Sequence, residues 1–96
     1  MFMAPIESTT ILALAPMASV QSVGEGAVVL LADSGQLFTC NETTEAFLLK
    51  LDGARSFAEV IDLLGAEFDA DSDTLAADFG SLALQLLDEH VIQRTG

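Results

Sequence analysis

The sequence has few of the residues on which metal binding, nucleophilic catalysis and disulfide cross-linking depend. Its 96 residues include one cysteine, one histidine, no tryptophan and no tyrosine. Because Cys40 is the only cysteine, a disulfide within the chain is excluded, and its separation from His90 matches no metal-ligand spacing. We therefore expect no metal and no other cofactor, a fold stabilised by one hydrophobic core, and a location in the reducing cytoplasm.

Basic residues are also scarce. The chain has three lysine and arginine residues (Lys50, Arg55 and Arg94) and 15 acidic residues, which gives a net charge of -12. Such a field repels nucleic-acid phosphates and anionic membranes, so we expect neither as a partner. Two interpretations of the acidity stay open: a solvated surface that keeps the domain soluble, or attraction of a basic partner.

The residues that are reactive elsewhere have structural explanations here. His90 ends the last predicted helix, where a cation complements the helix dipole, and Cys40 lies among apolar neighbours, where free cysteine usually behaves as a small hydrophobe. Asp69, Asp71 and Asp73 lack the glycine and the later glutamate of a calcium loop. We therefore expect no catalytic residue and no metal ligand, and we predict that the chain is not an enzyme.

The first half of the chain predicts a small antiparallel sheet. Residues 1–18 contain two prolines and hold no period for long, so we interpret them as an extended N-terminal arm that precedes a folded domain at 19–96. Short apolar runs at 19–23, 27–32 and 36–40 are separated by glycine-containing turns and predict a three-stranded meander. In its third strand, Leu37 and Thr39 face one way and Phe38 and Cys40 the other.

After residue 40 the apolar period changes to that of helices. A first helix begins after Asn41, whose side chain can cap it, and Gly53 can take the left-handed position at its end. Ser56 and Glu59 form a capping box for a second helix that ends between Gly65 and Asp69.

A third and longest helix begins near residues 71–73, with an apolar stripe of Leu75, Phe79, Leu82 and Leu86. Gly80 lies inside this helix, and we expect a close backbone approach there because small residues surround it. The predicted fold is α+β and winged-helix-like, a three-stranded antiparallel sheet followed by a three-helix bundle.

The segment from Cys40 to Leu64 resembles the PqqD family, whose hallmark is Leu-Asn, a hydroxyl residue, a hydrophobic helix, Asp-Gly, and then a Ser or Thr helix cap with Glu-Ile. Cys40, Thr44 and Lys50 depart from the family pattern. The resemblance covers roughly residues 27–93. The residues at the hallmark positions are Cys40-Asn41, Thr43, Asp52-Gly53, Ser56 and Glu59-Val60.

The resemblance implies a function in peptide recognition. PqqD is the peptide chaperone of pyrroloquinoline quinone biosynthesis, and similar domains recognise ribosomally synthesised, post-translationally modified peptides (RiPPs). In relatives, the precursor's leader adds as a strand to the edge of the third strand and lies against the third helix, while a partner enzyme, often a radical S-adenosylmethionine enzyme, does the chemistry. The partners implied are thus a precursor leader peptide and a modifying enzyme.

Placed on this sequence, the mode of binding makes residues 36–40 the edge strand, because an edge offers unpaired amides and carbonyls to an extended peptide. Phe79 would supply an apolar wall while small neighbours leave room for leader side chains, although one helical stripe can serve the core as well. The expected leader-binding residues are Gln36, Leu37, Phe38, Thr39, Cys40, Ala76, Phe79, Gly80 and Ala83.

Two other classes of protein share this layout. A winged-helix DNA-binding regulator needs a basic recognition face, whereas the third predicted helix carries Asp78, Asp88 and Glu89 and no lysine or arginine. A structural dimerisation module could exchange the N-terminal arm or a strand, so monomer and homodimer both stay open.

Overall fold

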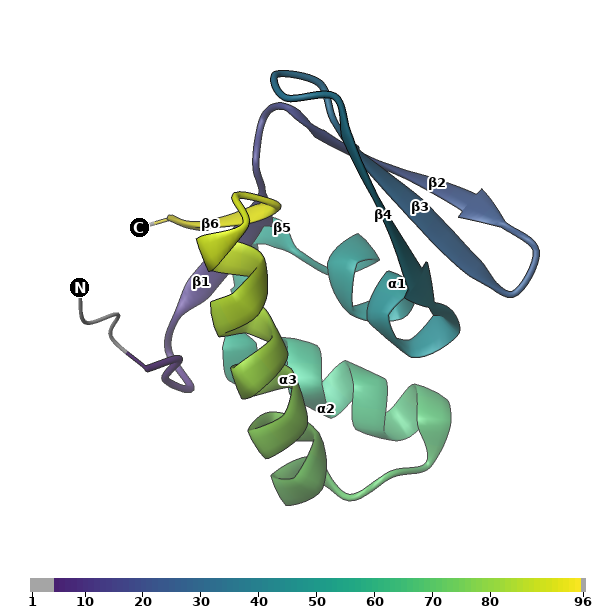
Figure 1. The fold of residues 1–96 in the computed structure, drawn as a ribbon. Helices are drawn as coiled ribbons and strands as arrows, with labels where there is room; N and C mark the ends of the chain where they lie inside the picture. The colour runs from purple at the N-terminus through teal and green to yellow at the C-terminus, as the bar shows by residue number, and fades with distance from the viewer. Residues whose placement is uncertain (1–4, 96) are drawn as a thin grey trace.

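The computed structural model describes residues 5–95 and contains two small antiparallel sheets and three helices (Figure 1). One sheet has the order β2-β3-β4, formed by Ala18–Val23, Gly26–Leu31 and Gln36–Asn41. The other has the order β5-β1-β6, formed by Asp52–Ser56, Ile11–Leu14 and Ile92–Thr95. The α+β class is confirmed, and so is the three-stranded meander.

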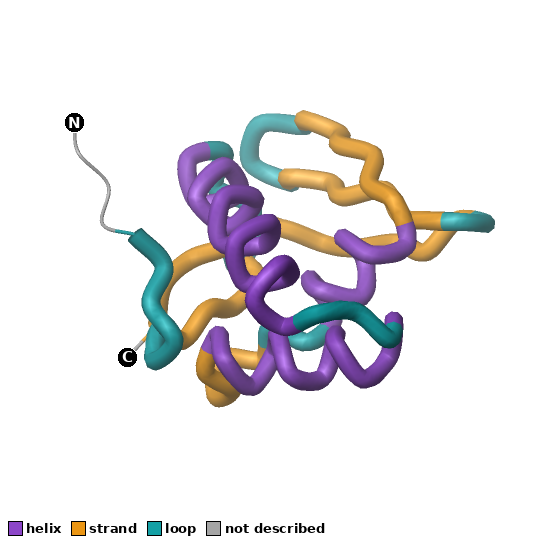
Figure 2. Tube along the Cα trace, turned by 90° about the horizontal axis from the view of Figure 1, so that it is seen from below, coloured by secondary structure: helices purple, strands orange, loops and turns teal. Residues whose placement is uncertain are grey.

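The three helices are α1 (Glu42–Leu49), α2 (Phe57–Phe68) and α3 (Ser72–Asp88). Helix α1 packs against the β2-β3-β4 sheet, α2 packs against α3, and α3 leads into β6 (Figures 1 and 2). The apolar stripes predicted for α2 and α3 meet α1 and the inner face of the sheet in one core. Its fully buried side chains include Leu12, Phe47, Leu48, Val60, Leu64, Val91 and Ile92.

The helix starts agree with the predicted caps. The Asn41 side chain accepts from the Thr44 amide at 2.9 Å, Ser56 and Glu59 form the capping box, and Asp71 accepts from the Thr74 amide at 3.1 Å. Helix α2 ends at Phe68, with Asp69 in the left-handed conformation. Each cap satisfies backbone groups that the helix itself leaves without a partner.

Two details predicted for glycine are corrected. Gly53 is left-handed (φ 77°) but does not end α1, which stops at Leu49; it lies in β5, where a Cβ added to it would lie 3.7 Å from the Ala13 Cβ of β1. The prediction of a close backbone approach at Gly80 is wrong, because a Cβ built there would meet no atom within 4 Å. Gly80 is thus a weak point of α3 and not a packing contact.

The sheet β5-β1-β6 was not predicted. Its central strand, β1, lies within the segment interpreted as an extended arm, and its Leu12 is 1% exposed. Register pairs such as Ile11 with Thr95 join segments from opposite ends of the sequence (Figure 1). Residues 1–4, the start of the expected arm, lie outside the described part of the chain, as does Gly96.

Candidate functional site

Strand β4 lies at one edge of its sheet. Within residues 5–95 it pairs with β3 and with no other strand, in a register that runs from Gly26 opposite Asn41 to Leu31 opposite Gln36. Every second residue of an edge strand directs its amide and carbonyl away from the sheet. The far side of β4 therefore offers the hydrogen-bonding groups that an added strand needs.

The burial of β4 alternates as predicted. Leu37, with 65% of its surface exposed, and Thr39 point away from the core, whereas Phe38 and Cys40 are half-buried and pack against it. Gln36, at the start of the strand, is exposed. The inner side of β4 thus contributes Phe38 and Cys40 to whatever lies between this strand and the helices.

A groove of about 180 Å³ lies between β4 and the second half of α3. Most of its wall is apolar, and its polar lining consists of Thr39, Thr44, Gln85 and Glu89, with no lysine or arginine. An engineered apolar cavity of about 150 Å³ admits benzene, so the groove has room for one leucine- or phenylalanine-sized side chain. The apolar lining comprises Val29, Phe38, Cys40, Leu48, Leu82, Leu86 and Val91.

The residues of α3 predicted to face β4 lie elsewhere. Phe79 is 5% exposed and Ala83 is fully buried, so both belong to the core. Ala76 lines a different pocket, between α2, α3 and the segment at Ile6. Gly80 is half-buried beside open space. The structure therefore brings Phe38, Thr39 and Cys40 to the groove but none of these four residues.

The groove is lined by Leu82, Gln85 and Leu86 of α3 and by Glu89, which caps the C-terminal end of this helix. They follow the i, i+3, i+4 and i+7 spacing of one helical face. Leu82 and Leu86 were visible in the sequence as members of the apolar stripe, but nothing local distinguishes a leucine that faces a groove from one that faces the core. Both are half-buried.

The thiol in the groove is not activated. Burial raises the pKa of Cys40; the Ala27 amide opposes this shift, and the charge of Glu45 adds to it. A raised pKa lowers the thiolate fraction and with it the nucleophilicity of cysteine. Among residues 5–95 no three His, Cys, Asp or Glu side chains are arranged to hold a metal ion.

Apart from Cys40, the residues at the hallmark positions do not line the groove. Asn41 caps α1, and Ser56 caps α2. Asp52 accepts from the amides of Arg55 (2.9 Å) and Ala54 (3.0 Å), which hold its pKa below the ordinary range, and the nearby Arg55 guanidinium lowers that pKa further. These residues fix how β4 turns into α1 and how β5 turns into α2.

No helix within residues 5–95 has the length and apolar character needed to cross a membrane. A search of curated protein sequences finds no significant match to this chain. Among solved structures, the chain is similar to "TbiB1 in Complex with the TbiA(beta) Leader Peptide", with a TM-score of 0.76 and 16% identity. The similarity covers 84% of this chain and 94% of TbiB1, and it supports the fold described above.

The family description "Coenzyme PQQ synthesis protein D (PqqD)" matches residues 26–92, a stretch that begins at β3 and includes β4 and all three helices. The match spans well over half of the chain and contains the whole groove. This match shows that the chain belongs to the PqqD family.

Proposed function

We propose that the chain is a RiPP recognition protein that binds the leader of a precursor peptide and presents it to a modifying enzyme. The leader adds as a strand to the free edge of β4, beside residues Gln36–Cys40, and directs one of its side chains into the groove. The observation that carries the proposal is this open edge lying next to an apolar groove. TbiB1, which has the same fold, is seen with a leader peptide, and this supports the proposal.

The physical basis is strand addition. Main-chain hydrogen bonds to β4 supply affinity that does not depend on the sequence of the leader, and the groove selects for an apolar side chain at one position. On α3 we assign the contact to Leu82 and Leu86, in place of the residues expected from the sequence. Catalysis is left to the enzyme, whose encounter with the precursor is favoured by the raised local concentration.

The test is a titration with leader peptides encoded beside this chain's own gene. We expect micromolar binding, with slowed hydrogen exchange of the β4 amides. Leu86→Gln should weaken binding about tenfold or more, because it places an amide in an apolar wall. Leu63→Gln, at a leucine of α2 that is 41% exposed, is the matched control and should leave affinity unchanged. Absence of binding by every such peptide, with the modifying enzyme present, would refute the proposal.

A further inference from the structure

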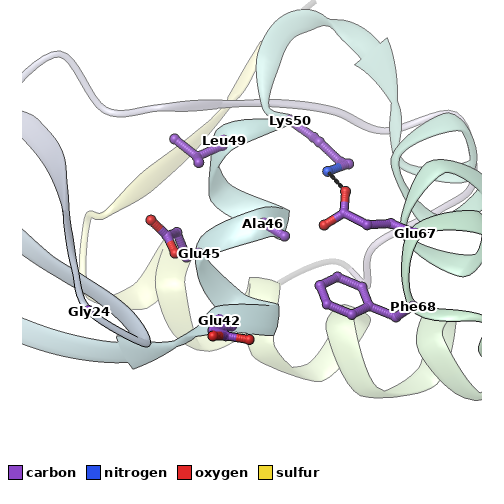
Figure 3. A pocket seen from close by; sticks show the side chains of 8 residues that line it. All are labelled: Gly24, Glu42, Glu45, Ala46, Leu49, Lys50, Glu67 and Phe68. Atoms are coloured by element: carbon purple, nitrogen blue, oxygen red, sulfur yellow. Dashed lines mark hydrogen bonds and ion pairs between the residues drawn. The ribbon is translucent and has the colours of Figure 1, made fainter.

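A second concave surface, of about 390 Å³, lies over the outer face of α1, between the β2–β3 turn and the end of α2 (Figure 3). Glu45 and Leu49 project toward the turn at Gly24, whereas Ala46 and Lys50 lie toward α2. Hereafter we call this the α1 outer surface. Its lining residues are Gly24, Glu42, Glu45, Ala46, Leu49, Lys50, Glu67 and Phe68.

The charges on the α1 outer surface are unbalanced. Lys50 Nζ lies 2.7 Å from Glu67 Oε1, and the Lys50 side chain is only 18% exposed, so this cation is already paired. Glu42 and Glu45 remain, three residues apart on one side of α1. Glu45 accepts a hydrogen bond from the Ser22 hydroxyl, which holds the carboxylate in place. The surface therefore carries two negative charges that no lysine or arginine of its lining balances.

Apolar side chains share this surface with the carboxylates. Leu49 is 61% exposed and Phe68 is 37% exposed. The first turn of a helix favours glutamate, and this accounts for Glu42 and Glu45 as solvated residues. It does not account for a leucine and a phenylalanine on the walls of the same hollow, since solvation of large apolar groups is unfavourable. The combination suits a ligand that is both cationic and apolar.

We propose that the α1 outer surface docks a basic segment of a partner protein, in which arginine or lysine side chains meet Glu42 and Glu45 while their aliphatic stems cover Leu49 and Phe68. Both cationic side chains bury their stems on apolar surface and keep the charged end at the carboxylates. Arginine also stacks on aromatic rings and pairs with carboxylates in a bidentate geometry.

The charge of the whole chain selects the occupant. At -12, the protein attracts a basic partner over long range and repels a second copy of itself. A second copy has only three lysine and arginine residues, of which Lys50 and Arg55 already lie close to Glu67 and Asp52. A basic segment from a different protein is therefore the complementary ligand.

The position of the α1 outer surface allows it to act together with the groove. Thr44 and Leu48 of α1 line the groove beside β4, whereas Glu42, Glu45 and Leu49 lie on the other surface. One short helix thus separates the two sites, and a leader in the groove leaves the outer surface free. The proposal goes beyond leader binding and can be tested without any leader.

The experiment uses methyl and ring NMR of the full chain with the peptide acetyl-Pro-Arg-Pro-Arg-Pro-amide as probe. Its prolines lack amide hydrogens, so it cannot add as a regular strand to β4. We expect a dissociation constant of about 1 to 10 mM, with shifts of the Leu49 and Ala46 methyls and the Phe68 ring. The methyls of Leu82 and Leu86, in the groove, should stay unshifted. The same peptide with glutamate in place of arginine should not bind.

Two variants decide between docking and simple attraction of cations. Glu42→Gln with Glu45→Gln should weaken binding about three- to tenfold, and Leu49→Gln about threefold. Asp62→Asn with Asp78→Asn is the matched control for the change in charge, and Leu63→Gln is the matched control for the loss of an exposed leucine. Neither control should weaken binding of the peptide. Thermal melts of all variants verify that they fold.

The proposal is overturned if the Leu49 methyls do not shift at about 10 mM peptide, or if Leu49→Gln binds as the parent does. It is also overturned if the control pair, Asp62→Asn with Asp78→Asn, weakens peptide binding as much as Glu42→Gln with Glu45→Gln does. None of these outcomes bears on the leader titration, which reports on the groove. A failure of leader binding with normal probe binding would refute the proposed function alone.

Discussion

Phe79 of α3 stacks on Phe47 of α1, with ring centroids 4.8 Å apart and an angle of 28° between the ring planes. Both rings are buried, and Phe57 meets Phe47 edge-on at 6.5 Å. This contact joins α1 and α3 in the core behind β4. Because the Phe79 ring packs on Phe47 in the core, the part of α3 that faces β4 is the next stretch along the helix, at Leu82 and Leu86.

Phe79→Ala should therefore reduce the free energy of unfolding by about 3 to 5 kcal/mol, since it leaves a cavity beside the Phe47 ring. Phe68→Ala, at a ring that is 37% exposed, is the matched control and should cost less than about 1.5 kcal/mol. Urea denaturation followed by circular dichroism measures both. Equal losses would show that Phe79 is no more a core residue than Phe68 is.

Gly80→Ala and Gly26→Ala should have opposite effects on stability. At Gly80 the added methyl meets open space, so the higher helix propensity of alanine should stabilise the protein by about 1 kcal/mol. At Gly26 the new Cβ would lie closer to the Cys40 carbonyl oxygen than atoms can approach, so β4 would have to shift. Chemical denaturation measures both changes.

The effect of Gly80→Ala on leader affinity adds a test of the groove. Gly80 does not line the groove, so binding of a leader should be unchanged. A clear loss of affinity in a stabilised protein would show that the leader extends along α3 as far as Gly80, as the sequence had suggested.

The sequence predicted the elements that have local signals. Period-2 and helical patterns predicted strands at 19–23, 27–32 and 36–40 and the three helices, and Asn41, Ser56 and Asp71 marked the helix starts. Strands β1, β5 and β6 have four or five residues each and obtain their hydrogen bonds from segments distant in sequence. Such short strands carry too few residues for a period, so their formation depends on tertiary pairing.

The candidate site divides in the same way. Strand alternation placed Phe38 and Cys40 on the same side of β4; in the structure this is the inner side, and both residues line the groove. On α3 the apolar stripe is wide enough to serve the core and the groove, and its rotation relative to β4 is set by the packing of Phe79 on Phe47. That contact joins residues 32 positions apart (79 minus 47), and no local pattern reports it.

Cys40 provides a chemical probe of the groove. Because burial raises its pKa above the ordinary value of 9.0, alkylation by iodoacetamide at neutral pH should be slower than that of an exposed thiol, and its rate should rise only at higher pH. Ser19→Cys in a Cys40→Ser background places the thiol at an exposed position of β2, away from the groove, as the matched control. A bound leader should slow the reaction of Cys40 further. Equal rates for the two thiols would contradict a protected position.

Asp52 should make stability depend on pH. Its folded-state pKa is lowered by the amides of Arg55 and Ala54, so the folded protein holds fewer protons here than the unfolded chain. The stabilisation is complete above the ordinary pKa of 3.8 and is lost as the pH falls through the lower folded value.

Asp52→Asn removes this dependence. Asp62→Asn, an exposed carboxylate with the same change in net charge, is the control. The measurement is the free energy of unfolding of each variant from about pH 6 to about pH 3. After the shift seen with Asp62→Asn is subtracted, the value for the parent should converge on the value for Asp52→Asn at the acid end. A constant difference across that range would mean that the amides of Ala54 and Arg55 do not favour the charged form of Asp52.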